Sequence, residues 1–150
     1  MATTFSNLLY HIVFSTKTRL PLIHQEIQGP VYEYIGGIIR KDGGILLEIG
    51  GVPDHIHILA KLRTDKAVAL VVQRIKGKSS KWLNERQAPK ERFAWQEGYG
   101  AFSVSESLVN KVRSYIRTQE EHHRRVSFKE ELIALLKRHR IPYDERYLVD

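Results

Sequence analysis

The chain has 150 residues, of which 42% are hydrophobic and 27% charged, a balance typical of one folded domain rather than of a disordered chain or a multidomain array. Its 24 Lys and Arg against 17 Asp and Glu give a formal net charge of +7, which favours a polyanionic partner such as nucleic acid. No cysteine is present, so disulfide scaffolds, thiol nucleophiles and cysteine-ligated zinc are excluded. Any metal site must therefore use histidine, carboxylate or amide ligands.

The sequence has no segment typical of a membrane span or a signal peptide. Its longest wholly apolar run covers residues 67–72, and the start of the chain lacks a basic stretch followed by an apolar one. We therefore expect a cytoplasmic protein that does not contact a membrane.

Six segments from the N-terminus onward carry strand or helix patterns. In chain order they are a strand at residues 8–15, a helix at 25–41, strands at 45–49 and 55–62, a helix at 66–86 and an interrupted strand at 93–103. A glycine and proline break at residues 50–54 separates the second and third strands, so we expect these two strands to form an antiparallel hairpin.

The order β, α, β, β, α, β predicts an α+β fold with a ferredoxin-like core, in which a four-stranded antiparallel sheet carries both helices on one face. The opposite face is then left open for function. We expect a single domain over residues 1–150, with its core at about residues 5–104.

Two further helices are expected after the core. Residues 103–123 form the first, and a capping box at Ser127 and Glu130 begins the second, which runs to about Arg140 before Pro142 ends it. Residues 127–150 thus form a C-terminal helix and a short tail.

Two histidines stand out in the third predicted strand. Because side chains alternate across a strand, His55 and His57 share one face while Ile56 and Ile58 lie on the other. The apolar face can pack on the helices, and the two imidazoles then project together from the uncovered side, close enough to bind one divalent cation. The alternative is a pair of solvated strand histidines.

A tyrosine and a glutamine stand one helical turn apart after the last strand. Tyr115 and Gln119 therefore share a helix face. A tyrosine can attack phosphorus as a covalent nucleophile, and an amide oxygen can complete a metal site that two histidines begin. On spacing alone, a tyrosine and a glutamine on a helix are usually surface or boundary residues, and Tyr143 and Tyr147 in the tail are competing nucleophiles in principle.

Other histidines have a simpler interpretation. His122 and His123 follow Gln119 and are interpreted as exposed residues near a helix C-terminus; the alternative places either one beside the site as a proton acceptor or a phosphate contact. The same two interpretations apply to His11 on the first strand.

A basic helix face is the best candidate for contacts with DNA phosphates. It comprises Lys66, Arg74, Lys76, Lys78, Lys81 and Arg86, with Glu85 as the one acid in the segment. Arg117 extends the basic surface near the tyrosine helix. A solvated helix face is the alternative.

Residues 51–57 (GVPDHIH) resemble the His-hydrophobic-His motif of the IS200/IS605-type single-tyrosine transposases and their REP-associated relatives. Further stretches resemble the same family in order along the chain: residues 10–17 (YHIVFSTK), 76–84 (KGKSSKWLN), 95–105 (WQEGYGAFSVS) and 115–123 (YIRTQEEHH). A lone His-x-His motif is weak, whereas this ordered set covers nearly the whole chain.

The resemblance implies a metal-dependent transposase that cleaves and rejoins single-stranded DNA with hairpin ends. Tyr115 matches the family's nucleophile, and His55, His57 and Gln119 match its ligands for Mg²⁺ or Mn²⁺. A 5′-phosphotyrosine intermediate is implied, as is a homodimer in which the histidines of one chain meet the tyrosine helix of the other. Gly98 and Gly100 would let that helix leave its own core.

Two other functions fit the same sequence. One is a noncatalytic nucleic-acid-binding module on the same fold, which the net charge alone would support. The other is a domesticated relative that processes dispersed REP sequences in a prokaryotic nucleoid, and no residue separates it from a mobile transposase.

Overall fold

The computed structural model describes residues 3–86 and 92–148. The strands are β1 (Leu8–Ser15), β2 (Ile45–Val52), β3 (His55–Leu62) and β4 (Gly100–Val104). The helices are α1 (Gln25–Lys41), α2 (Val68–Arg86), α3 (Val109–Arg117), α4 (Gln119–His122) and α5 (Phe128–Arg138). Short 3₁₀ turns lie at Lys17–Arg19, Glu106–Leu108 and Glu145–Tyr147.

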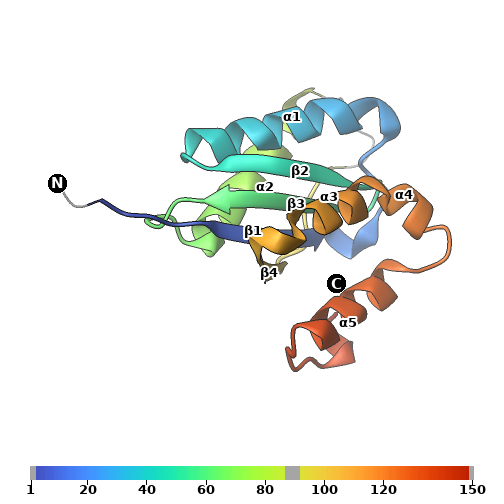
Figure 1. Cartoon of the computed structure of the whole chain (residues 1–150). Coiled ribbons are helices and arrows are strands. Elements are labelled where there is room, and N and C mark those ends of the chain that lie inside the picture. The colour runs from blue at the N-terminus through green and yellow to red at the C-terminus, as the bar shows by residue number, and fades with distance from the viewer. Residues whose placement is uncertain (1–2, 87–91, 149–150) are drawn as a thin grey trace.

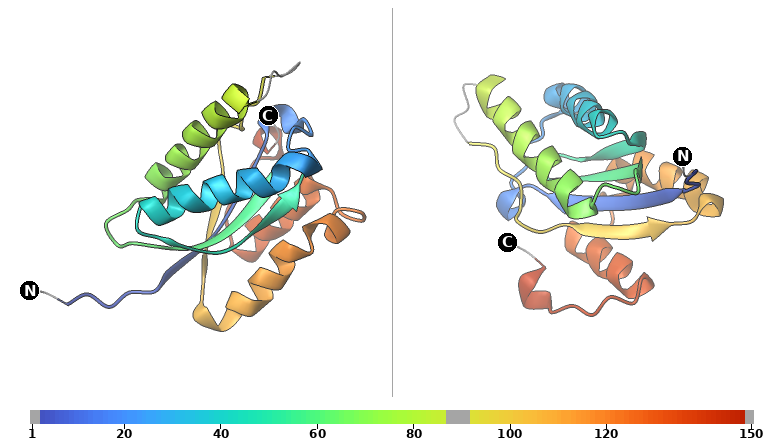
Figure 2. Two further views of the ribbon diagram at one scale, coloured as in Figure 1. Left: turned by 90° about the horizontal axis from the view of Figure 1, so that it is seen from above. Right: turned by 90° about the vertical axis from the view of Figure 1, so that its left-hand side faces the viewer.

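The four strands form one antiparallel sheet in the order β2-β3-β1-β4. Helices α1 and α2 cover one face, and the segment from α3 to α5 lies on the other (Figures 1 and 2). This arrangement confirms the predicted α+β class and the ferredoxin-like core with additional C-terminal helices.

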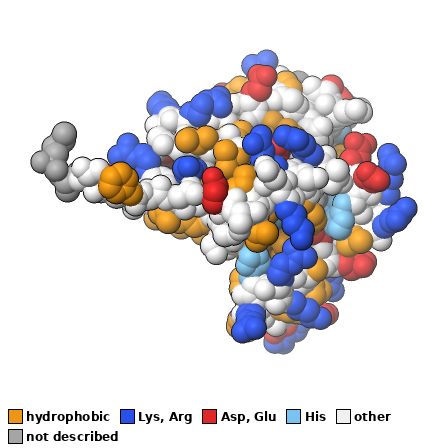
Figure 3. Space-filling model, viewed as in Figure 1, with side chains coloured by type: hydrophobic (Ala, Val, Ile, Leu, Met, Phe, Trp, Pro, Cys, Tyr) orange, Lys and Arg blue, Asp and Glu red, His pale blue; other side chains and the backbone are white. Residues whose placement is uncertain are grey.

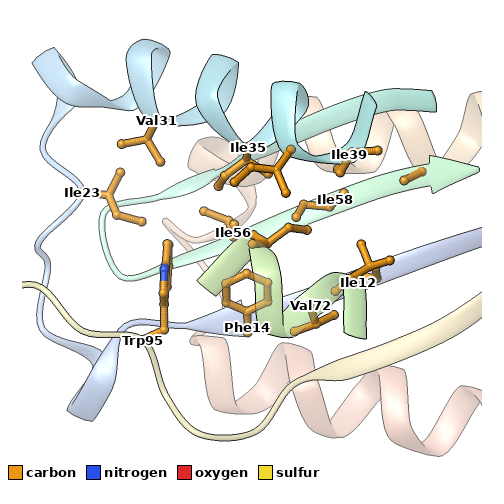
Figure 4. Close-up of a cluster of buried hydrophobic side chains, with 14 of the residues drawn as sticks. Ile12, Phe14, Ile23, Val31, Ile35, Ile39, Ile56, Ile58, Val72 and Trp95 are labelled. Atoms are coloured by element: carbon orange, nitrogen blue, oxygen red, sulfur yellow. The ribbon is translucent and has the colours of Figure 1, made fainter. Parts of the chain in front are cut away.

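The main hydrophobic core lies between the sheet and helices α1 and α2. Ile56 and Ile58 of β3 and Phe14 of β1 point into it and are fully buried, as Figure 4 shows. Burying each such side chain contributes roughly 1.5–3 kcal/mol. Because β3 alternates, this packing fixes His55 and His57 on the opposite face of the sheet.

That opposite face is covered, whereas the sequence predicted an open one. Helix α5 places Phe128, Leu135 and Leu136 against Val13 of β1 and Phe102 of β4 in a second, smaller core. The prediction was wrong because it did not include the return of the C-terminal helices over the sheet. In consequence the side chains of both β3 histidines are completely buried.

Helix α3 approaches β2 closely at a glycine. A Cβ atom at Gly50 would lie 2.6 Å from the carbonyl oxygen of Ile116, and real Cβ atoms do not approach so near. Glycine at this position therefore allows the backbone of α3 to lie directly on the sheet. Ile116 itself is fully buried beneath the helix.

Several element boundaries differ from those expected. Strand β2 continues to Val52, which leaves a two-residue turn at Pro53 and Asp54. The long helix expected over residues 103–123 is divided at Thr118, whose backbone leaves the helical region (φ −100°, ψ 21°) and whose hydroxyl donates to the Ser114 carbonyl at 3.0 Å. A threonine hydroxyl that bonds back to the preceding turn competes with helical hydrogen bonding.

The last strand is shorter than expected because a lysine holds the segment before it. The ammonium group of Lys76 donates to the carbonyl oxygens of Gln96 at 2.8 Å and of Gly98 at 2.6 Å. Among the described residues 92–99, Trp95 forms an isolated bridge with Thr16 before β4 begins. No helix in the described part of the chain is both long and apolar enough to cross a membrane.

Candidate active site

His55 and His57 lie near the start of β3, next to the turn. Asp54 lies in that turn and its Oδ1 atom is 2.7 Å from His55 Nδ1, which leaves His55 Nε2 facing the covered side of the sheet. Burial lowers the pKa of His57 and so favours its neutral form. Neutral imidazole is the form that binds metal ions.

His11 extends this histidine pair to the neighbouring strand. Its Nε2 atom is 2.8 Å from His57 Nδ1, across the paired strands β1 and β3. Burial, together with the nearby His57, lowers the pKa of His11 to about 3. A neutral His11 hydrogen-bonded to one ring nitrogen fixes the orientation of His57 and directs the other nitrogen into the site.

Tyr115 and Gln119 lie in the same cluster as the histidines, although the helix break at Thr118 separates Tyr115 from Gln119. Gln119 begins α4, is almost completely buried, and places its Oε1 atom 3.3 Å from His55 Nε2. Its Nε2 atom remains 3.4 Å from the carbonyl oxygen of Tyr115, so the one-turn spacing survives the break. The structure thus places all four residues named from the sequence in one cluster within one chain.

Glu131 occupies the centre of this cluster, and the sequence analysis did not identify it. Its Oε1 atom is 2.9 Å from His57 Nε2 and 3.4 Å from His55 Nε2, and its Oε2 atom accepts a hydrogen bond from the hydroxyl of Tyr115. The side chain is 2% exposed. One sequence signal existed: Glu131 lies three residues after Phe128 and four before Leu135, a carboxylate within the apolar stripe of α5.

His123 also belongs to the cluster, so its interpretation as an exposed residue was wrong. Its Nε2 atom is 2.9 Å from Gln119 Oε1 and 3.2 Å from Glu131 Oε1. Its Nδ1 atom is 2.7 Å from the carbonyl oxygen of Val126, so both ring nitrogens of His123 face oxygen atoms. His122 is more exposed and lies 3.3 Å from Glu131 Oε2.

The donor atoms of the cluster fit a divalent metal ion. They are the Nε2 atoms of His55, His57 and His123 and the Oε1 atoms of Gln119 and Glu131. Neighbouring donors are 2.9–3.4 Å apart, close to the roughly 3 Å between adjacent ligands of an octahedral ion with bonds of about 2.1 Å. The three histidines and Glu131 form one group whose ligand atoms all lie within 4.8 Å of one another. Imidazole nitrogen suits Mn²⁺ better than Mg²⁺, which prefers oxygen.

The charge on Glu131 controls the neighbouring phenol. Burial would raise the pKa of Glu131, but hydrogen bonds from His123, His55 and His57 hold it far below its usual range. Burial, together with this negative charge, raises the pKa of Tyr115 well above its ordinary value. Without a cation in the cluster, Tyr115 is therefore a neutral phenol whose hydroxyl is directed at a carboxylate.

Helix α2, which carries the basic residues of segment 66–86 other than Lys66, lies on the opposite face of the sheet from α3, the helix that contains Tyr115 (Figure 2). Two of these basic residues have structural roles: Arg74 forms an ion pair with Asp42, and Lys76 holds the chain before β4. The other basic residues of the segment are Lys66, Lys78, Lys81 and Arg86. Arg117 lies on α3, near the site, with its Nε atom 2.9 Å from Glu48 Oε1.

The competing tyrosines lie in the tail beyond α5. Tyr147 is 78% exposed in a 3₁₀ turn, and Tyr143 packs against the second core. Neither hydroxyl has a hydrogen bond with a described candidate metal ligand, which distinguishes both from Tyr115.

Comparison with known proteins identifies related sequences and folds. Residues 4–119 match the family model described as "Transposase IS200 like". The transposase for insertion sequence element IS200 from Salmonella typhimurium is 32% identical over 130 residues, which cover 81% of this chain and 82% of that protein. The ISDra2 transposase TnpA from Deinococcus radiodurans is 24% identical over 117 residues, covering 75% and 84% of the two chains.

Two solved structures share the fold. A crystal structure of a Deinococcus radiodurans protein described as a transposase has a TM-score of 0.63 at 22% identity and covers 79% of this chain and 95% of that chain. A REP-associated tyrosine transposase bound to a REP hairpin has a TM-score of 0.63 at 12% identity, covering 82% and 72%.

Proposed function

Because the chain belongs to the family of IS200-like transposases, we propose that it cleaves and rejoins single-stranded DNA through a covalent phosphotyrosine intermediate. One observation carries this proposal. The hydroxyl of Tyr115 lies in the same cluster as the candidate metal ligands of β3, α4 and α5, to which Glu131 joins it.

His55, His57 and Gln119 would hold the metal ion, with His123 and Glu131 as two further ligands. A Mg²⁺ or Mn²⁺ ion held there would supply Lewis acidity toward the scissile phosphate and would offset negative charge on its oxygens. His11 and Asp54 keep the two β3 imidazoles in the orientation that directs their Nε2 atoms inward.

Tyr115 is the nucleophile in this proposal. Its oxygen forms a bond to phosphorus while the bond from phosphorus to the 3′-oxygen breaks, which yields a 5′-phosphotyrosine and a free 3′-hydroxyl. The phenol loses one proton and the departing 3′-oxygen gains one. Because the new ester retains a phosphodiester, a different 3′-hydroxyl can attack it and rejoin the strands without a nucleotide cofactor.

We propose single-stranded DNA with hairpin ends as the substrate. The net charge of +7 suits this polyanion, and the REP-associated relative is bound to a REP hairpin. A domesticated enzyme that processes chromosomal palindromes would use the same residues. Hairpins at both ends of an element that carries this gene would favour mobility, and scattered palindromes elsewhere would favour domestication.

The homodimer with composite sites that the resemblance implies is a separate proposal. In the structure one chain brings together Tyr115, His55, His57 and Gln119 by itself. We therefore propose that a single chain can form a complete site. Mixing two inactive variants tests the alternative, in which two chains of a homodimer exchange their α3 segments.

The proposal is tested with 5′- and 3′-labelled oligonucleotides that carry the DNA flanking the gene. The wild-type protein and Tyr115→Phe are incubated with them in Mg²⁺, Mn²⁺ or EDTA, and the products are separated on a denaturing gel. We expect a metal-dependent covalent adduct on the 5′ side of the break that is absent from the variant. Hairpin binding with no adduct under either metal would instead support the noncatalytic binding module.

A further inference from the structure

A cavity beside the nucleophile has no assigned role. It encloses 490 Å³ between the edge of β4 and helices α3 and α5, and the ring of Tyr115 forms part of its wall. The remaining wall is mostly apolar and includes Leu108, Val112 and Leu135, with the imidazoles of His11 and His139 also lining it. Its volume lies within the range typical of small-molecule sites.

Two cations line the same cavity. Lys111 of α3 and Arg138 of α5 are exposed, and neither forms an ion pair with an acidic side chain in the described part of the chain. Figure 3 shows Lys and Arg side chains around hydrophobic ones over α3 and α5 on this face. An apolar recess with cations beside it matches a nucleotide, whose base is apolar on both faces and whose flanking phosphates are anionic.

We infer that this cavity is the subsite for one nucleotide next to the scissile phosphate, with its base in the apolar recess and a flanking phosphate on Lys111 and Arg138. This inference rests on the proposed function, because it names the part of the substrate that lies beside Tyr115. The position of the cavity favours a nucleotide as its ligand. When a DNA strand places its scissile phosphate at the Tyr115 hydroxyl, the adjacent nucleotide must lie near the Tyr115 ring, which forms part of the cavity wall.

The basic residues of α2 do not offer an equivalent site. Arg74 forms an ion pair with Asp42 and Lys76 donates to backbone carbonyls, and the sheet separates α2 from α3. The cavity therefore adjoins the reacting atoms, whereas α2 does not.

The inference is tested in the inactive Tyr115→Phe background, which separates binding from cleavage. A series of oligonucleotides carries the fluorescent base 2-aminopurine at one position each along the strand next to the hairpin. We expect the fluorescence to change on binding at one nucleotide, and this change to be lost in Leu108→Trp, which fills the cavity from a half-exposed position. Leu70→Trp, a half-exposed position on α2, is the matched control and should keep the response.

Cleavage provides the second measurement. With active protein, removing the base of that nucleotide should slow adduct formation at least about fivefold. The same removal should have no further effect in Leu108→Trp, while hairpin binding measured with a remote label stays unchanged. A fluorescence response that persists in Leu108→Trp, or a response at no position, overturns the subsite. If wild-type protein forms no adduct on any substrate, the proposed function is overturned instead. The fluorescence series then still shows whether the cavity binds one base, because it does not depend on cleavage.

Discussion

Glu131 connects the two halves of the candidate site. One carboxylate oxygen lies among the imidazole nitrogens and the other accepts the hydrogen bond of Tyr115. A buried carboxylate in this position is stabilised by the histidines and in turn keeps the phenol neutral. Occupation of the cluster by a cation would therefore change the electrostatic environment of the nucleophile as well as that of the phosphate.

Replacing Glu131 with Gln removes the charge but keeps the size of the side chain. We expect the affinity for Mn²⁺, measured by isothermal titration calorimetry, to fall at least about tenfold, because losses of this order follow the removal of groups that support a metal site. Glu130→Gln is the matched control, since a capping box accepts either residue and Glu130 is exposed. Equal affinities in the two variants would remove Glu131 from the ligand set.

The residues of the site differ in how far the sequence could identify them. Strand alternation predicts that His55 and His57 share one face of the sheet. Helical spacing, together with the family resemblance, identifies Tyr115 and Gln119 as their partners. His123 and Glu131 enter the site only when α4 and α5 fold back over the sheet. No local pattern encodes that docking, which depends on apolar contacts between segments far apart in the chain.

At the scale of elements, the position of α3 depends on its contact with the sheet. The carbonyl oxygen of Ile116 faces the Cα atom of Gly50 on β2, and Tyr115 precedes Ile116 directly. A change at Gly50 therefore moves the helix that carries the nucleophile. The sequence predicted the strands and helices of the core well, but it joined α3 and α4 into one helix because nothing in the apolar spacing shows the hydrogen bond at Thr118.

The variant Gly50→Ala tests this dependence. The added Cβ atom would overlap the α3 backbone, so we expect the free energy of unfolding to fall by about 1–3 kcal/mol in urea titrations. Gly77→Ala is the contrasting change, because a Cβ atom there meets nothing within 4 Å and alanine favours a helix interior. It should raise the free energy of unfolding by about 0.5–1 kcal/mol. Equal effects at the two positions would contradict the close packing of α3 on β2.

At the scale of the whole molecule, one face of the sheet packs on the main hydrophobic core and the other face carries the candidate site. Helices α1 and α2 lie on one face and bury the main core, whereas the segment from α3 to α5 lies on the other face (Figure 1). On that second face the histidines of β3 are buried, and α3 carries Tyr115. The antiparallel order of the strands was predictable from the element order, and the covering of the second face was not. The structure thus forms the site within one chain.

Mixing two inactive variants tests whether one chain is sufficient. His57→Ala lacks a candidate metal ligand and Tyr115→Phe lacks the nucleophile, so neither should form an adduct alone. If each site is complete within a chain, their mixture should remain inactive, with a mixture of either variant and wild-type protein as the positive control. Adduct formation by the mixed variants would show that the homodimer shares its sites between chains.

The most direct test of the central claim is to identify the side chain that carries the DNA after cleavage. Trypsin would place Tyr115, Tyr143 and Tyr147 in separate peptides, at residues 114–117, 141–146 and 147–150. After nuclease trimming of the adduct, mass spectrometry should find the remaining phosphonucleotide on the peptide of residues 114–117. A nucleotide on either tail peptide, or on a residue other than tyrosine, would contradict the assignment of Tyr115 as the nucleophile.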